Sequence, residues 1–465
     1  MPPGWRGFFL IRTHSRFWLR CSRALIVALV CALALAHAPQ LTVPQLAQAA
    51  SRNTQRNGAV VPSLGEADVR TLRERGTVKA ALTELSAGYE RMVRDLVVLT
   101  EIPAPSFKEE ARAARFAALL REAGLKDAYI DEEGNVVAER RGVGGGPTLV
   151  LAAHLDTVFP PGTDVRVKKN GTVYSAPGIG DDTHGLAVML AIVRALQAAR
   201  LPTRGDLIFV GDVGEEGLGN LRGVRYLFEK SDLRKRIDLF ISLDGLGDNA
   251  ITNGGVGSRR FRVTFKGPGG HSYGAFGLVN PAYALAAAAD RISRIRVPKT
   301  PKTTYNIGVY GGGTSVNSIP DAVWMEVDLR SESPAELAKL ETRMRAAVIL
   351  AVAEENRERS TQQGALTVDV KLIGEREGGL TPASSPIVQT AAAVTRAMGR
   401  TPVLRYSSTD SNVPMSMGIP AITIGSGGRG GRAHSLAEWV DVDKATTLPG
   451  MERALLIALG LVGVE

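Results

Sequence analysis

The stretch TLVLAAHLDT, residues 148–157, decides the fold of this chain. It begins with an apolar run, residues 148–153, of the kind found in strands that are buried on both faces of a parallel sheet. His154 and Asp156 follow where this strand should end. In open α/β sheets, ligands bind beyond the carboxyl ends of the strands. The stretch therefore predicts an α/β fold with a polar site at one edge of its sheet.

Strands and helices alternate on both sides of this stretch, which is the pattern of an α/β domain. The expected helices have apolar residues spaced three and four apart, and the expected strands are short apolar runs. We expect helices over residues 89–99, 109–123, 181–199, 223–229 and 387–398 and from residue 445. We expect strands over residues 128–131, 136–140, 148–153, 206–213, 237–244, 401–404 and 421–424.

A different order of elements interrupts this pattern after residue 257. Strands are expected over residues 259–266, 304–309, 322–329 and 366–373, with helices over 280–295 and 334–357. This β-α-β-β-α-β order is typical of a self-contained α+β domain of the ferredoxin-like kind. We therefore expect a first domain in two parts, residues 88–257 and 379–465, an inserted domain over residues 258–378, and a polar linker over residues 50–87.

The positive charge of the chain is concentrated at its N-terminus. The whole sequence carries a formal net charge of +9, and residues 1–49 contain five arginines and no acidic residue. The +9 less these five leaves +4 for the rest of the chain. Because the sequence shows no basic stripe with interleaved aromatic residues, we expect no nucleic-acid partner.

Residues 1–49 have the features of a secretory signal. An arginine-rich start precedes the apolar run over residues 24–36, and small residues end in Ala47-Gln48-Ala49. The run is too short for a comfortable membrane span. We expect a cleaved signal peptide and a periplasmic or secreted protein, with an uncleaved N-terminal anchor as the alternative. Both cysteines, Cys21 and Cys31, lie in this segment, so any metal in the mature chain must be held by His, Asp and Glu.

Metal-type ligands follow several expected strands of the first domain. Taken alone, each has a structural explanation, such as adjacent acidic residues at a helix N-terminus. Together they should converge, because parallel strands present their carboxyl ends at one edge of a sheet. Two histidines and three carboxylates can hold two zinc ions, with one aspartate between them. The candidates are His154, Asp181, Glu216, Asp244 and His434.

These residues lie in motifs by which the chain resembles the family of zinc exopeptidases and deacylases that includes peptidase T, carboxypeptidase G and acetylornithine deacetylase. The resemblance runs from about residue 88 to the C-terminus. It implies a zinc-exopeptidase catalytic domain, with a mixed sheet flanked by helices, and an inserted domain that acts as a lid and forms a homodimer. The motifs are HLDT (154–157), GDDTHG (180–185), GEEGLG (214–219), LDG (243–245), GPGGHS (267–272), NSIPD (317–321) and AHSLAE (433–438).

The resemblance implies a role for each candidate. The five ligands above would bind two metal ions, with the first aspartate of GDDTHG bridging them. Asp156 would orient His154, and Glu215 would take a proton from the attacking water and return it to the leaving amine. His271 of a partner subunit would stabilise the oxyanion, and Asn317 and Arg330 would hold the carboxylate end of the substrate. The alternatives are a turn residue for His271 and a solvated strand-end residue for Arg330.

The expected function is that of an exopeptidase acting on small peptides, with two Zn²⁺ ions, for which Co²⁺ or Mn²⁺ are possible substitutes. An N-acyl-amino-acid deacylase using the same centre is the alternative. A third possibility is an inactive periplasmic binding protein on the same scaffold. The chain departs from the family at His184, where lysine is common, so that an additional ligand at this position has to be considered.

Overall fold

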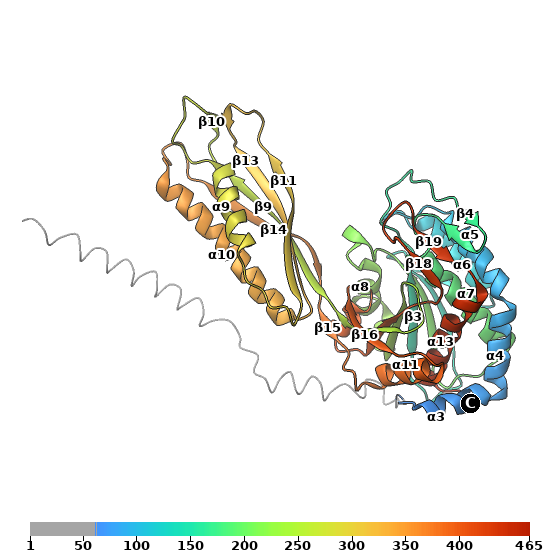
Figure 1. Cartoon of the computed structure of the whole chain (residues 1–465). Helices are drawn as coiled ribbons and strands as arrows, with labels where there is room; N and C mark the ends of the chain where they lie inside the picture. Colours follow the sequence, from blue (N-terminus) through green and yellow to red (C-terminus); the bar gives the residue numbers. More distant parts are fainter. Residues whose placement is uncertain (1–60, 62) are drawn as a thin grey trace, which may run out of the picture. The chain divides into compact units, whose positions relative to one another are not determined.

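The computed structural model describes Val61 and residues 63–465 (Figure 1). The expected signal peptide over residues 1–49 lies outside the described residues. Within the described chain, residues 257–376 form what we call the inserted lobe, and the residues before and after it form the first lobe. Each lobe has its own hydrophobic core. The expected α/β fold with an inserted α+β part is confirmed.

The first lobe is built on a nine-stranded mixed sheet with the order β1-β2-β6-β3-β7-β17-β8-β15, in which β16 also pairs with β8. Strands β6, β3, β7 and β17 are adjacent and parallel, so their carboxyl ends lie at one edge. The strands are β1 (Tyr129–Ile130), β2 (Val136–Arg140), β3 (Leu149–His154), β6 (Leu207–Asp212), β7 (Leu239–Leu243), β8 (Ala250–Gly255), β15 (Gly379–Leu380), β16 (Val403–Ser407) and β17 (Ala421–Ile424).

Helices cover both faces of this sheet (Figure 1). Along β3, Leu149, Leu151 and Ala153 belong to the larger hydrophobic cluster, and Val150 and Ala152 belong to the smaller cluster on the other face. The run is apolar throughout because both faces are buried. The larger cluster includes residues of α5 (Tyr89–Thr100), α6 (Glu110–Glu122), α7 (Thr183–Ala198), α11 (Pro386–Ala397) and α13 (Lys444–Val462).

Helix α13 is the one described helix that is long and apolar enough to cross a membrane by length and composition. However, 72% of its apolar window is buried inside the protein. Its residues Met451, Leu455 and Leu459 are completely buried in the larger cluster of the first lobe. Its apolar character is therefore explained by the core.

The prediction of a linker over residues 50–87 is wrong for residues 66–87. These residues form α3 (Glu66–Glu74) and α4 (Gly76–Ala87), which pack against α11 and α7 respectively. Val69, Val78 and Leu85 are at most 1% exposed. The apolar residues are sparse among charged ones, so the local pattern is weak, and the helices are stabilised by burial of one face against the lobe.

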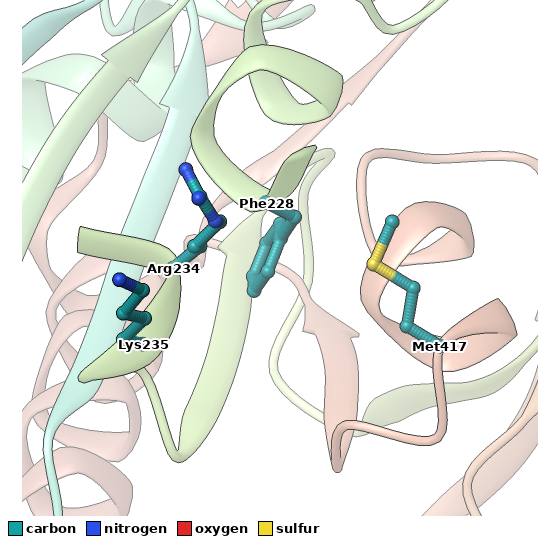
Figure 2. Close-up of a pocket in the computed structure, with 4 residues that line it drawn as sticks. All are labelled: Phe228, Arg234, Lys235 and Met417. Atoms are coloured by element: carbon teal, nitrogen blue, oxygen red, sulfur yellow. The ribbon is translucent and has the colours of Figure 1, made fainter. Parts of the chain in front are cut away.

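The smaller cluster lies under α8 (Arg222–Glu229) and α12 (Asn412–Ser416). Phe228 packs edge-on against Phe240 there, with ring centroids 5.6 Å apart. A pocket on this side of the lobe is lined by Phe228, Arg234, Lys235 and Met417 (Figure 2). None of the site residues expected from the sequence lines it.

The inserted lobe has the expected β-α-β-β-α-β order. Its antiparallel sheet has the order β11-β13-β9-β14, which is the ferredoxin-like arrangement. Along β9, alternate residues Phe261, Val263 and Phe265 are buried under the two helices, as the period of a strand with one covered face requires. The elements are β9 (Gly257–Lys266), α9 (Pro281–Ser293), β11 (Thr303–Gly312), β13 (Ala322–Ser331), α10 (Pro334–Glu358) and β14 (Thr367–Arg376).

Two small sheets were not expected from the sequence, because their strands have only two or three residues. In the first lobe, β4 (Lys168–Asn170), β5 (Val173–Ser175), β18 (Arg429–Gly431) and β19 (Trp439–Asp441) form a four-stranded sheet. In the inserted lobe, β10 (Gly270–His271) pairs with β12 (Ser318–Ile319). The first of these sheets supports the loop that carries His434.

Candidate metal centre

The candidate ligands meet at the carboxyl ends of four adjacent parallel strands. His154 is the last residue of β3, and Asp244 directly follows β7. Glu216 lies in the loop after β6, and His434 lies between the short strands β18 and β19, which follow β17 in the chain. His434 has a positive φ of 62°, which is uncommon for a residue with a side chain and recurs at functional sites. The strand order thus brings together residues that are far apart in the sequence.

Asp181 joins these ligands into two groups. It lies just before α7, and the peptide bond that follows it is cis. Ligand atoms of His154, Asp181 and Asp244 lie within 4.8 Å of one another, as do those of Asp181, Glu216 and His434. Asp181 Oδ1 is 2.9 Å from Nε2 of His154, and Oδ2 is 3.1 Å from Nε2 of His434. One carboxylate therefore presents an oxygen to each group.

This donor set fits two divalent metal ions. Each group supplies one imidazole nitrogen and two carboxylates, counting the shared one, and such ligands suit zinc and neighbouring transition metals. A third group, consisting of His154, Glu215 and Glu216, also lies within 4.8 Å. Glu215 is engaged by an arginine, however, and this contact distinguishes it from the other carboxylates.

The electrostatics of the site reflect crowding of carboxylates in a buried place. Burial, followed by the charge of Asp181, raises the pKa of Asp244 to about 7. Burial also raises the pKa of Glu215 to about 8, against the opposing effect of Arg376. Hydrogen bonds to Asp181 and then Glu216 raise the pKa of His434 to about 10. So many acidic groups at one place favour the binding of cations.

Asp156 supports the site through the backbone of its neighbours. Its Oδ1 accepts a hydrogen bond from the Glu215 N–H at 2.9 Å, and its Oδ2 accepts one from the Glu216 N–H at 3.0 Å. The Nδ1 atom of His154 is 3.0 Å from the backbone oxygen of Asp156 and 3.6 Å from its Oδ1. The ring is thus oriented chiefly by the carbonyl group, and the carboxylate holds the loop that carries both glutamates.

The other expected residues lie elsewhere. His184 is 1% exposed, forms no part of the three ligand groups among the described residues, and is 2.7 Å from Ser426 Oγ through Nδ1. It is therefore a buried structural histidine, which answers the question of an additional ligand.

His271 lies exposed in β10, and Asn317 lies exposed just before β12. Arg330 pairs with Asp328 on β13 at 2.7 Å. These last three belong to the inserted lobe and are in none of the ligand groups.

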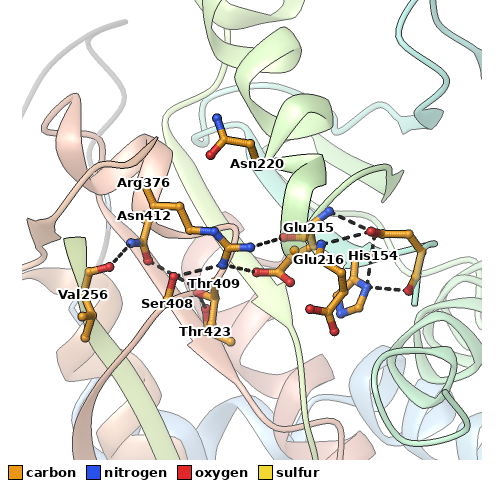
Figure 3. A network of polar contacts seen from close by, with 12 residues as sticks. His154, Glu215, Glu216, Asn220, Val256, Arg376, Ser408, Thr409, Asn412 and Thr423 are labelled. Atoms are coloured by element: carbon orange, nitrogen blue, oxygen red, sulfur yellow. Dashed lines mark hydrogen bonds and ion pairs between the residues drawn. The ribbon is translucent and has the colours of Figure 1, made fainter. Parts of the chain in front are cut away.

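Three residues of the site were missed by reasoning from the sequence. Ser106 donates a hydrogen bond to Asp156 Oδ2 at 2.6 Å. Glu438 accepts hydrogen bonds from the backbone N–H groups of Gly178, Gly180 and Asp181, at 2.7–2.9 Å, and so shapes the loop that carries the shared ligand. Arg376 donates to Glu215 Oε1 at 2.9 Å (Figure 3). Only Glu438 lies in a motif that the sequence singles out, AHSLAE.

Comparisons with known proteins agree with this fold and site. The model of peptidase family M20/M25/M40 matches residues 150–456. Succinyl-diaminopimelate desuccinylase of Corynebacterium glutamicum is 25% identical over 386 residues, which cover 80% of this chain and 99% of the relative. The crystal structure of aminopeptidase PepT from Bacillus cereus covers 81% of this chain and 99% of its own, with a TM-score of 0.66 and 22% identity. The YXEP protein of Bacillus subtilis, described as a dinuclear metal binding peptidase of the M20 family, has a TM-score of 0.59 and 18% identity, and the match covers 81% of this chain and 99% of that one.

The fold and the shared ligand define a class of hydrolases with a dinuclear metal centre at the edge of an α/β sheet. This chain belongs to the peptidase family M20/M25/M40. It is therefore a hydrolase of amide bonds that carries a site for two metal ions, as the motifs of the sequence predict.

Proposed function

We propose that the protein is an exopeptidase that cleaves small peptides, with two zinc ions held by His154, Asp181, Glu216, Asp244 and His434. The observation that carries this proposal is the placement of one Asp181 oxygen toward each of two histidines, at 2.9 and 3.1 Å. The nitrogen and oxygen donors are of the kind that zinc takes in catalytic sites. Metal analysis of the purified protein tests the assignment, and we expect two zinc ions per chain.

The residues of the chain divide the reaction between them. When bound, a metal pair polarises the scissile carbonyl and lowers the pKa of water. Glu215, whose carboxylate lies within 4.8 Å of the ligand atoms of His154 and Glu216, takes the proton of the attacking water. It then gives this proton to the nitrogen of the leaving amine. Asp156 holds the backbone of Glu215 and Glu216, so that Glu215 stays placed as the base and Glu216 as a metal ligand.

Two classes of substrate, which differ in the acyl group beside the scissile amide, fit this centre. The motifs GPGGHS and GEEGLG resemble those of peptidase T and carboxypeptidase G, which favours a peptide. The similarity to a succinyl-diaminopimelate desuccinylase supports a second candidate, an N-acyl-amino-acid deacylase. Steady-state hydrolysis of trialanine, dialanine, N-acetyl and N-succinyl amino acids separates the two. A kcat/KM that is highest for an N-acyl amino acid would replace the exopeptidase assignment.

A binding protein without catalytic activity is not favoured, because the complete ligand set and Glu215 converge in one place. The Glu215→Gln variant tests the catalytic role directly. We expect it to retain both metal ions and to lose at least about 10²-fold in kcat, which is the usual contribution of a general base. Full activity in this variant would refute the role of Glu215.

We also propose a homodimer in which His271 acts on the site of the partner subunit. The Nδ1 atom of His271 accepts hydrogen bonds from the N–H groups of Tyr273 and Gly274, at 3.2 and 3.3 Å. The proton of the neutral ring therefore lies on Nε2, which is free to donate to an oxyanion. Beside it, the side chains of Tyr273, Phe276 and Val316 are 90, 82 and 102% exposed. An exposed apolar surface of this kind is typical of a contact with another chain.

Complementation between two inactive variants tests this arrangement. His271→Ala removes the oxyanion donor, and Glu215→Gln removes the base. In a mixed dimer, one site would combine an intact Glu215 with an intact His271 from the other subunit. We expect activity to reappear when the two variants are mixed and allowed to exchange subunits. A mixture that stays inactive although light scattering shows mixed dimers would contradict action in trans.

The features of residues 1–49 support a periplasmic or secreted location. An arginine-rich start, an apolar run over residues 24–36 and the small residues Ala47-Gln48-Ala49 are those of a cleaved signal. Cell fractionation together with N-terminal sequencing of the mature protein tests this. Recovery of an uncleaved chain from the membrane fraction would indicate an N-terminal anchor instead.

A further inference from the structure

Arg376, which is not a candidate metal ligand, makes two hydrogen bonds to Glu215. It is the last residue of β14, at the point where the chain leaves the inserted lobe. One guanidinium nitrogen, Nη1, donates to Glu215 Oε1 at 2.9 Å. The other, Nη2, donates to the backbone oxygen of Glu215. Figure 3 shows the guanidinium group pointing toward Glu215, with Glu216 and His154 beyond it.

The pair is shielded from water. The side chains of Arg376 and Glu215 are 8% and 7% exposed. A buried charge pair joined by a hydrogen bond holds a side chain in one orientation, because any other orientation leaves a charge without a partner. The N–H group of Glu215 is bound by Asp156, so the residue is held on both sides of its backbone as well. Among the described residues, no hydrogen bond to Glu215 Oε2 is found, which leaves this oxygen for water and substrate.

Arg376 itself is fixed by the segment that joins the two lobes. Its Nη1 also donates to Ser408 Oγ at 3.0 Å. Nearby, the side-chain amide of Asn412 donates to the carbonyl groups of Val256 and Glu377, at 2.9 and 2.8 Å. Val256 and Glu377 lie on the two stretches of chain that connect the lobes. The position of the guanidinium group is therefore determined by the junction between the lobes.

We propose that Arg376 is a positioning residue for the amide hydrolysis: it holds Glu215 so that one carboxylate oxygen faces the metal ligands, and it does so from the junction between the lobes. The inference rests on the proposed role of Glu215 as the base. Because its two guanidinium nitrogens donate to two different groups, the arginine restricts both the side chain and the carbonyl group of Glu215, which a point charge cannot do. The orientation of a base matters because small misplacements of reacting groups reduce rates about 10²-fold.

The test uses the metal-loaded protein and the peptide or N-acyl amino acid that it hydrolyses fastest in the substrate panel. Arg376→Met keeps most of the length of the side chain and removes both donors. We expect kcat to fall about 10²-fold, with KM changed less than about threefold and metal content unchanged. Arg376→Lys keeps the charge but cannot make both hydrogen bonds, so its kcat should lie between those of Arg376→Met and the wild type. Arg262→Met, the same substitution at an arginine of the inserted lobe that pairs with Glu326 at 2.7 Å, is the matched control, and its kcat should stay within about twofold of the wild type.

A double variant separates positioning from a general structural effect. If Arg376 acts through Glu215, adding Arg376→Met to Glu215→Gln should lower kcat by no more than about twofold further. A crystal structure of Arg376→Lys should show the Glu215 side chain in more than one orientation. If Arg376→Met does not fold, Arg376→Lys, with its melting temperature measured, gives the kcat comparison.

Two results would overturn the inference. The first is a folded, metal-loaded Arg376 variant with a kcat within about threefold of the wild type. The second is a double variant in which the two losses multiply, which would mean that Arg376 acts independently of Glu215. If Glu215→Gln alone keeps full activity, the role of Glu215 itself is refuted, and the inference falls with it. The single variant therefore distinguishes a failure of the proposed function from a failure of the positioning role.

Discussion

Lowering the pH should destabilise the protein through His184. The side chain is 1% exposed on α7. Ser426 Oγ donates its proton to the carbonyl group of Gly245 at 2.9 Å, so it accepts a hydrogen bond from Nδ1–H of His184. No partner of Nε2 is found among the described residues. A proton added to Nε2 would create a buried charge without an acceptor, and burial accordingly lowers the pKa of His184 to about 4.

The size of the effect follows from this pKa. The unfolded chain, with an ordinary histidine pKa of 6.5, binds the proton more readily than the folded chain does. The contribution of the neutral His184 ring to the free energy of unfolding is therefore complete above about pH 6.5 and is lost as the pH falls toward about 4. The free energy of unfolding should decrease by ~1.4 kcal/mol per pH unit in this range, or ~3 kcal/mol in total.

Urea unfolding of the wild type and of His184→Asn at a series of pH values from about 4 to 7 measures this contribution. The asparagine amide keeps a donor near the position of Nδ1 and does not titrate. Carboxylates elsewhere titrate in both proteins, so they cancel in the difference. The advantage of the wild type over the variant should shrink by ~3 kcal/mol between neutral pH and about pH 4. A difference that stays constant within ~0.5 kcal/mol over this range would refute the reasoning.

Three further predictions concern the shared ligand and the two cores. Asp181→Asn should reduce the metal content to below two ions per chain, because one amide cannot present a charged oxygen to both ligand groups; a content of two would contradict the sharing. Gly450→Ala should lower the free energy of unfolding by ~2 kcal/mol, since the added Cβ would lie 2.2 Å from the backbone of Gly427; unchanged urea unfolding would contradict this. Phe261→Ala should cost ~3–5 kcal/mol through a cavity in the inserted lobe, whereas Val143→Ala, at a residue of the first lobe that is 60% exposed, should cost less than ~0.5 kcal/mol in the same assay.

The sequence by itself determined the types of the main elements and which residues are candidates for metal binding. The apolar run that becomes β3 is continuous because both faces are buried, and the alternation in β9 follows from one covered face. Both patterns are local, so they can be read without the fold. The residues from His154 to His434 were also recognisable, because each lies in a short motif beside a strand end or a glycine-rich turn.

Only the tertiary structure decided which contacts join distant parts of the chain. Helices α3 and α4 are weakly patterned, and burial against α7 and α11 stabilises them. The contact between Arg376 and Glu215 spans 161 residues, and no motif surrounds the arginine. Likewise, Glu438 reaches the loop of Asp181 across 257 residues. A partner for a buried charge is chosen by the packing of strands and loops in space, and the local sequence contains no signal for it.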